Sequence, residues 1–157
     1  MDLLLWLENT SIAQAISASV WMYPTFESLH YVGLALLLGG IMLIDLRLLG
    51  YARSLPLRTM ITLLPWVWVG FLVNVITGTL MFVYGASSFG TNRAFQIKLV
   101  LMALAGINAL LFTIAASRSG QDWVSTGQTP ITVRVIATLS MVFWLGVMTA
   151  GRWMAYV

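Results

Sequence analysis

The pattern of apolar and polar residues along this chain predicts four long helices that cross a membrane. Apolar stretches of the length that spans a bilayer, about 20 residues, recur four times and are separated by short segments rich in polar residues, glycine and proline. The expected spans are residues 24–49, 59–84, 93–116 and 131–156. We therefore predict an all-α integral membrane four-helix bundle, with residues 1–157 forming a single transmembrane domain and no room for a soluble one.

The N-terminal segment, residues 2–20, has a different pattern. It mixes a run of leucines and Trp6 with Glu8, Asn9 and Gln14, which makes it too polar to span a membrane but suited to lie in the headgroup layer as one or two amphipathic interfacial helices. No basic residue precedes Arg47, so the segment lacks the positive region of a cleavable signal peptide, and we expect it to remain on the mature protein.

Composition supports a lipid bilayer as the main partner and excludes several kinds of site. Hydrophobic residues make up 60% of the chain and charged residues 8%, with a mean hydropathy of +0.92. The net charge of +3 comes from scattered single residues and not from a basic face, so nucleic acid is not expected as a partner. Because there is no cysteine, disulfides, thiolate metal sites, iron–sulfur clusters and covalently attached haem are excluded.

The distribution of basic residues predicts the orientation, because cytoplasmic loops are enriched in lysine and arginine. The first and third connections carry Arg47, Arg53, Arg58, Arg118 and Arg134, whereas the opposite side carries Arg93, Lys98 and Arg152. This bias predicts a multi-pass protein of the bacterial inner membrane with both termini on the periplasmic side.

His30 is the only histidine, and it lies near the start of the first expected span, one helical turn after Glu27. Ionisable groups are costly at membrane depth and are functional candidates there. One interpretation is a neutral imidazole that hydrogen bonds between helices. The other is an axial ligand to haem iron, or a copper ligand, whose second ring nitrogen is held by a neighbouring group such as Glu27.

Other candidate residues are expected at the same depth as His30. Lys98, Arg93 and Arg152 either reach the membrane interface or lie near haem propionates. Met148 or Met81 is a candidate metal ligand, although methionine is more often a core filler. The candidate set is His30, Glu27, Gly33, Lys98, Arg93 and Arg152 for a cofactor, and His30 with Met148 for a metal.

Small and amide residues inside the spans have two interpretations. Gly33 either lets two helices pack closely or leaves a slot for a flat macrocycle beside His30. Asn74 and Asn108 lie at similar depth in their helices, and we expect them to join neighbouring helices by hydrogen bonds.

Several motifs spread over nearly the whole chain carry a resemblance to a family of small, uncharacterised bacterial four-helix inner-membrane proteins. They are P-T-F-E-S-L-H-Y-V-G, L-I-D-L-R-L-L-G, P-W-V-W-V-G-F, I-T-G-T-L-M-F, N-R-A-F-Q-I-K, G-I-N-A-L and A-G-R-W-M-A-Y. More distantly, the pattern is similar to the membrane protoporphyrinogen oxidase, which binds haem b, and to the copper-resistance membrane protein. The counterparts of their shared residues are His30, Thr77-Gly78 and Lys98, but the further histidines of a copper transporter are missing.

These observations lead to one main hypothesis and two alternatives. The main one is a b-type haem protein that takes part in redox chemistry or electron transfer at the periplasmic side of the membrane, as a homo-oligomer with a periplasmic or membrane redox partner. The first alternative is a copper-handling or transport protein that uses His30 and Met148 or Met81. The second is a cofactor-free membrane subunit.

Overall fold

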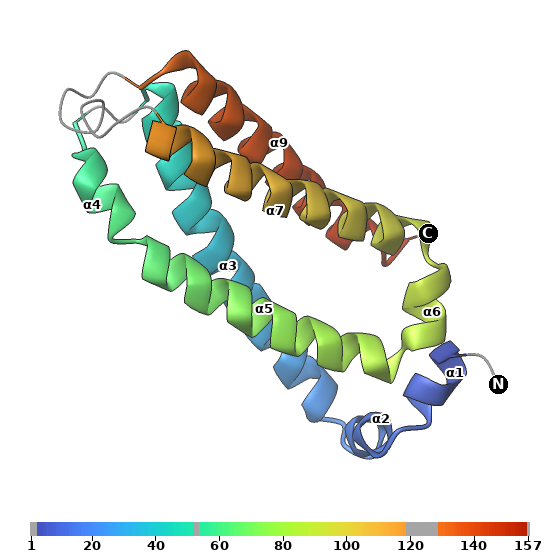
Figure 1. Cartoon of the computed structure of the whole chain (residues 1–157). Helices are drawn as coiled ribbons and strands as arrows, with labels where there is room; N and C mark the ends of the chain where they lie inside the picture. The colour runs from blue at the N-terminus through green and yellow to red at the C-terminus, as the bar shows by residue number, and fades with distance from the viewer. Residues whose placement is uncertain (1–2, 52–53, 119–128, 157) are drawn as a thin grey trace.

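The computed structural model describes residues 3–51, 54–118 and 129–156, and within these ranges the chain forms helices and no strand (Figure 1). The short helices are α1 (Leu3–Glu8), α2 (Ser11–Ser17), α4 (Leu57–Ile61) and α6 (Ala86–Thr91). The long helices are α3 (Met22–Leu49), α5 (Leu64–Tyr84), α7 (Arg93–Arg118) and α9 (Ile131–Trp153). All four long helices are long and apolar enough to cross a membrane, which confirms the predicted all-α membrane bundle.

The long helices follow one another around the bundle in the order α5, α3, α9, α7. α3 packs along both α5 and α9, and α7 packs along α9, whereas α5 and α7 make little direct contact (Figure 1). At one end, however, the Phe82 ring of α5 stacks on the Phe95 ring of α7 with centroids 5.3 Å apart. We call this end, which also holds α1, α2, α6 and the C-terminus, the α6 end, and the opposite end, which holds α4, the loop end.

Two helix boundaries differ from the expected ones. The expected span 59–84 is divided into α4 and α5, because Pro65 stands in the first turn of α5 and its ring would clash with a carbonyl if the helix continued from α4. The polar segment between the second and third expected spans, residues 85–92, contains the short helix α6 after Gly85.

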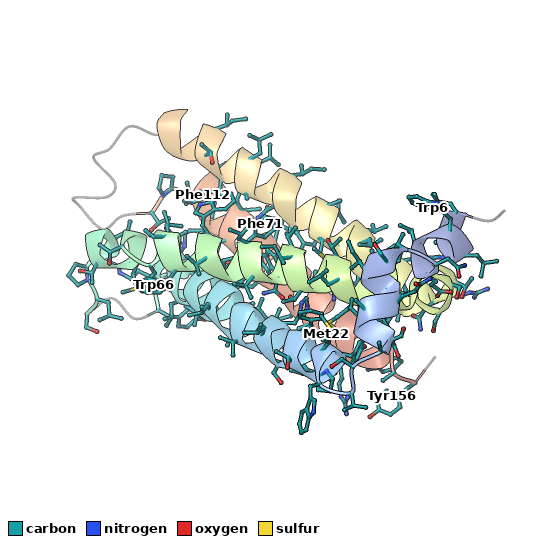
Figure 2. The ribbon with its side chains drawn as sticks, turned by 90° about the horizontal axis from the view of Figure 1, so that it is seen from below. Trp6, Met22, Trp66, Phe71, Phe112 and Tyr156 are labelled. Atoms are coloured by element: carbon teal, nitrogen blue, oxygen red, sulfur yellow. The ribbon has the colours of Figure 1, made fainter. Side chains whose placement is uncertain are left out.

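The N-terminal segment forms two short helices at the α6 end, as its amphipathic pattern predicts. Thr10 caps α2, with its hydroxyl oxygen accepting from the Ala13 N–H. Ala13 and Ile16 are buried against the bundle, while Trp6 remains half-exposed. In Figure 2, Trp6 and Tyr156 mark the α6 end, and Trp66 and Phe112 lie toward the loop end.

The best-defined hydrophobic core lies at the loop end, where residues of α3, α4 and α9 meet. Its members are Leu48, Leu57, Met60, Val133 and Ala137. Many large apolar side chains of α5 and α7 are exposed, such as Trp68 and Ile107. Such a surface belongs in lipid, which supports a multi-pass membrane protein.

Candidate functional site

The His30 ring of α3 is hydrogen bonded to α5. Its Nδ1 lies 2.9 Å from Oγ1 of Thr77. The Thr77 hydroxyl donates its own hydrogen to the Val73 carbonyl oxygen, 2.7 Å away in the same helix, so it can only accept from the imidazole. This chain of bonds assigns the proton to Nδ1 and leaves Nε2 with a free lone pair, the state in which an imidazole binds a metal.

The crossing of α3 and α5 sets the position of this ring. A Cβ atom on Gly33 would lie 3.0 Å from the Gly70 carbonyl oxygen, and one on Gly70 would lie 2.6 Å from the Gly33 carbonyl oxygen. The two backbones are therefore in contact at these glycines. Of the two roles predicted for Gly33, the structure shows the packing role, and α5 fills the space beside it where a slot was considered.

Gly78 gives the imidazole its room beside α5. A Cβ atom at this position would lie 3.3 Å from Cε1 of His30 and 3.8 Å from its Nδ1. A larger residue would therefore press on the ring that Thr77 holds.

Lys98 of α7 is the nearest charged candidate on another helix. Its side chain is half-buried and runs beside Gly151 of α9, with Nζ 3.7 Å from the position of a Cβ on that glycine. Lys98, 68 positions after His30 in the sequence, lies close enough for its charge to act on the imidazole.

The residue that hydrogen bonds to the His30 ring is not Glu27, the partner suggested by the sequence. Its Oε1 accepts from the Tyr31 hydroxyl at 3.5 Å on the exposed side of α3, and the partner of the ring is Thr77. Sequence reasoning pointed to Thr77 only through a distant resemblance. The spacing of Gly70, Thr77 and Gly78 along one helix was the available signal, because small residues that recur every one or two turns mark a helix contact face.

Three further candidates, Arg93, Met148 and Arg152, lie at the surface of the bundle, whereas Met81 is half-buried. Arg93 is exposed, and Met148 is 45% exposed. Arg152 donates from Nη2 to the Tyr156 hydroxyl at 2.8 Å and stacks over the Tyr156 ring, 5.2 Å from its centroid. Within the described ranges, none of the three shares a hydrogen bond or ion pair with His30, and no group of three or more His, Asp or Glu residues is placed to hold a metal ion.

The two asparagines in the spans differ from each other. Asn108 is buried and donates from Nδ2 to the Ile136 carbonyl oxygen of α9 at 3.1 Å, which confirms that it joins helices. Asn74 donates to the Gly70 carbonyl oxygen of its own helix at 2.9 Å, and so does not make the expected bond to a neighbouring helix.

Asp45 of α3 is a further buried polar residue that the hypotheses above do not use. It is 6% exposed, Ser140 of α9 lies within its hydrogen-bonding reach, and its Oδ2 has no partner. A buried carboxyl oxygen without a hydrogen-bond partner lowers the stability of the folded protein.

Comparisons with known proteins identify a family but no function. No curated protein and no solved structure matches the chain, so the similarity to the haem-binding and copper-resistance groups gains no support from them. One family model matches residues 4–157, nearly the whole sequence, and its description is "family of unknown function (DUF6644)". The chain belongs to this DUF6644 family.

Proposed function

We propose that this chain is a membrane haem b protein that takes part in redox chemistry, with Nε2 of His30 as the axial ligand to the iron. The observation that carries the proposal is the bond from His30 Nδ1 to Thr77, whose hydroxyl hydrogen is already donated to Val73. Histidines that bind metals almost always have the other ring nitrogen held in this way, because the bond fixes the tautomer and the direction of the ring.

Each neighbouring residue has a defined task in this proposal. Thr77 orients the ring, and Gly78 leaves space on the α5 side of it. Lys98 supplies a positive charge in the interior that would offset the carboxylates of a haem. When bound, the haem supplies the ability to take up and release one electron.

The number of histidines bears on the assembly. A second axial histidine would have to come from another copy of the chain, because His30 is the only one in the sequence. The half-exposed Met148 side chain is turned to the surface of the bundle, which makes it a weak candidate for a ligand on the same iron. In a homo-oligomer, each subunit would hold one haem through its own His30.

We place the proposed site on the periplasmic side of a bacterial inner membrane, within reach of a redox partner there. The excess of arginine in the first and third connections supports this orientation. Single cysteines can be introduced at Ser17 and at Tyr51, since the chain has none of its own. A membrane-impermeant maleimide should label the Ser17→Cys variant in intact cells and the Tyr51→Cys variant only after lysis, and the reverse pattern would invert the topology.

An absorption spectrum of protein purified from haem-replete cells tests the function. We expect a Soret band whose absorbance per protein falls at least about tenfold in His30→Gln. Circular dichroism and size-exclusion chromatography of the same samples check that the variant is folded. Thr77→Val should retain some haem but with weaker binding and a shifted reduction potential, because the ring loses its acceptor.

Two results would overturn the haem proposal. One is a colourless wild-type preparation without porphyrin, and the other is a Soret band of equal strength in His30→Gln. Copper without porphyrin in elemental analysis would point instead to the copper-handling alternative.

The same hydrogen bond also supports a second candidate, a cofactor-free subunit. In this case the bond between His30 and Thr77 serves only to hold α3 against α5. In that case His30→Gln, which can still donate to Thr77, should leave the spectrum, the stability and the assembly of the protein unchanged.

A further inference from the structure

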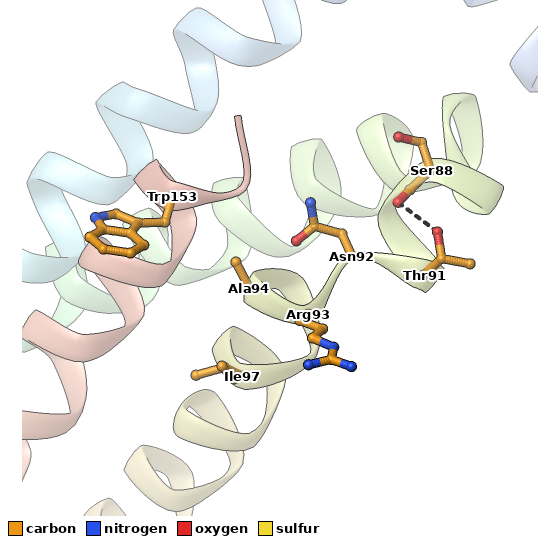
Figure 3. A pocket seen from close by; sticks show the side chains of 7 residues that line it. All are labelled: Ser88, Thr91, Asn92, Arg93, Ala94, Ile97 and Trp153. Atoms are coloured by element: carbon orange, nitrogen blue, oxygen red, sulfur yellow. Dashed lines mark hydrogen bonds between the residues drawn. The ribbon is translucent and has the colours of Figure 1, made fainter. Parts of the chain in front are cut away.

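A pocket at the α6 end lies outside the His30 region. It has a volume of about 510 Å³ and is formed where α6, the start of α7 and the end of α9 meet (Figure 3). Its lining residues are Ser88, Thr91, Asn92, Arg93, Ala94, Ile97 and Trp153. The pocket thus opens at the terminus of two membrane-spanning helices, the depth at which lipid headgroups begin.

Asn92 holds the walls of this pocket together. Its Oδ1 accepts from the Phe95 N–H at 3.0 Å and so caps α7, while its Nδ2 donates to the Met154 carbonyl oxygen just after α9 at 3.1 Å. The start of α7 and the end of α9 are therefore fixed relative to each other, and the pocket is part of the folded bundle.

The lining divides into a polar and an apolar part. Arg93 and the two hydroxyl residues Ser88 and Thr91 form the side toward α6, whereas Ile97 and Trp153 continue along the membrane-spanning helices (Figure 3). The Arg93 side chain is exposed, and it has no hydrogen bond or ion pair with any of the described residues. Glu8, whose carboxylate contacts α6, already accepts from the Ser87 hydroxyl and N–H through its Oε1.

A pocket at the membrane boundary that is lined by hydroxyl residues, an apolar wall and a guanidinium without a partner among the described residues matches an amphiphile with a negatively charged head. We propose that this pocket binds the phosphate of an anionic phospholipid, with Arg93 as the charged contact and an acyl chain along Ile97 and Trp153. The start of α7 adds the positive end of its helix dipole to the same side. The proposal is independent of the haem and of the orientation, because both leaflets contain phosphate headgroups.

Native mass spectrometry of the full chain in detergent can test this proposal with three probes. These are phosphatidylglycerol, phosphatidylcholine with the same acyl chains, and inorganic phosphate. We expect phosphatidylglycerol to bind more tightly than phosphatidylcholine, and Arg93→Gln to weaken phosphatidylglycerol binding about fivefold, the scale of one basic residue at a membrane surface.

Arg152→Gln is the matched control. It removes the same charge at the same end of the bundle, but from a side chain that is occupied by Tyr156 and lies outside the pocket lining. This variant should bind phosphatidylglycerol as the wild type does. Ile97→Gln, at an exposed position of the apolar wall, should weaken phosphatidylglycerol binding without affecting the fold.

Three results would overturn the assignment. Equal binding by Arg93→Gln and wild type would exclude Arg93 as the contact. Equal affinity for the two lipids would remove the charge selectivity. If inorganic phosphate at millimolar concentration displaced phosphatidylglycerol or stabilised the protein as strongly, the pocket would be a site for free phosphate.

Discussion

The two best-packed helix pairs of this bundle, α3 with α5 and α7 with α9, are held together by different means. In the first pair, Gly33 and Gly70 bring backbone against backbone. In the second pair, side chains fill the contact: a Cβ on Gly146 would meet Cδ1 of Leu101 at 2.9 Å, and Asn108 bonds to the Ile136 carbonyl. The atoms that face Gly70 are mostly backbone atoms of α3, which can move only if the helices separate, whereas the atoms that face Gly146 are the flexible end of the Leu101 side chain.

This difference assigns the two candidate residues of the site to different surroundings. His30 belongs to the rigid pair and is held by Thr77 beside Gly78. Lys98 belongs to the adjustable pair, and its long side chain runs beside Gly151. In the proposed haem site, His30 would therefore be the ligand of fixed direction and Lys98 the cation that adapts to the haem carboxylates.

The largest effect is expected for Gly70→Ala. The added Cβ would lie 2.6 Å from the Gly33 carbonyl oxygen and 2.7 Å from the Leu37 backbone nitrogen, so the helices must separate. We expect a loss of about 1–3 kcal/mol in the free energy of unfolding, the usual cost of overpacking. Denaturation by sodium dodecyl sulfate, followed by circular dichroism in mixed micelles, measures it.

Two alanine variants sharpen this comparison as controls. Gly39→Ala places its Cβ in open space on the same pair, with nothing within 4 Å, and should be neutral or slightly stabilising. Gly146→Ala meets only the end of the Leu101 side chain and should cost less than Gly70→Ala. If all three glycines respond equally, the two pairs do not differ in the way described.

A smaller effect is expected when the polar bond of the α7–α9 pair is removed. Asn108→Ala loses the 3.1 Å bond from Nδ2 to the Ile136 carbonyl oxygen, and such bonds are worth about 1 kcal/mol between membrane helices. The same denaturation experiment measures the loss. Thr113→Ala is the control, because its hydroxyl donates only within α7, to the Ala109 carbonyl oxygen at 3.0 Å, and equal losses in the two variants would contradict a role for Asn108 between helices.

The sequence was sufficient to predict the helices but not their contacts. Apolar length alone determines which segments can span a membrane, and all four expected spans have a long helix in the structure. Pro65 was visible as an early proline of the second span, yet the division into α4 and α5 depends on where the helix can restart.

The candidate site shows the same limit more clearly. A lone histidine in an apolar span can be recognised from sequence, because ionisable groups are rare there. Its partner cannot, since Glu27 is close in sequence while Thr77, 47 positions away, is close in space. Asn74 and Asn108 illustrate this too: they are the same residue type at similar depth, yet one bonds within its helix and the other across to α9.

The smallest effect should be confined to the N-terminal helices, outside both pairs. Glu8 accepts from the Ser87 hydroxyl at 2.6 Å and from the Ser87 N–H at 2.8 Å, which connects α1 to the start of α6. The Ser87 hydroxyl and then its backbone N–H lower the pKa of Glu8 from its ordinary value of 4.5. The stabilisation is therefore complete above about pH 4.5 and is lost as the pH falls through the lowered pKa of the folded state.

A spin label on Leu5→Cys, an exposed position of α1, can follow this contact by electron paramagnetic resonance. We expect the label to become more mobile as the pH falls below about 4.5, while circular dichroism of the long helices stays unchanged. In Glu8→Gln, which keeps the size of the side chain but cannot ionise, the label should be mobile at neutral pH and insensitive to acid. A label that stays immobile throughout the titration of the wild type would show that the two helix pairs hold α1 in place without the carboxylate.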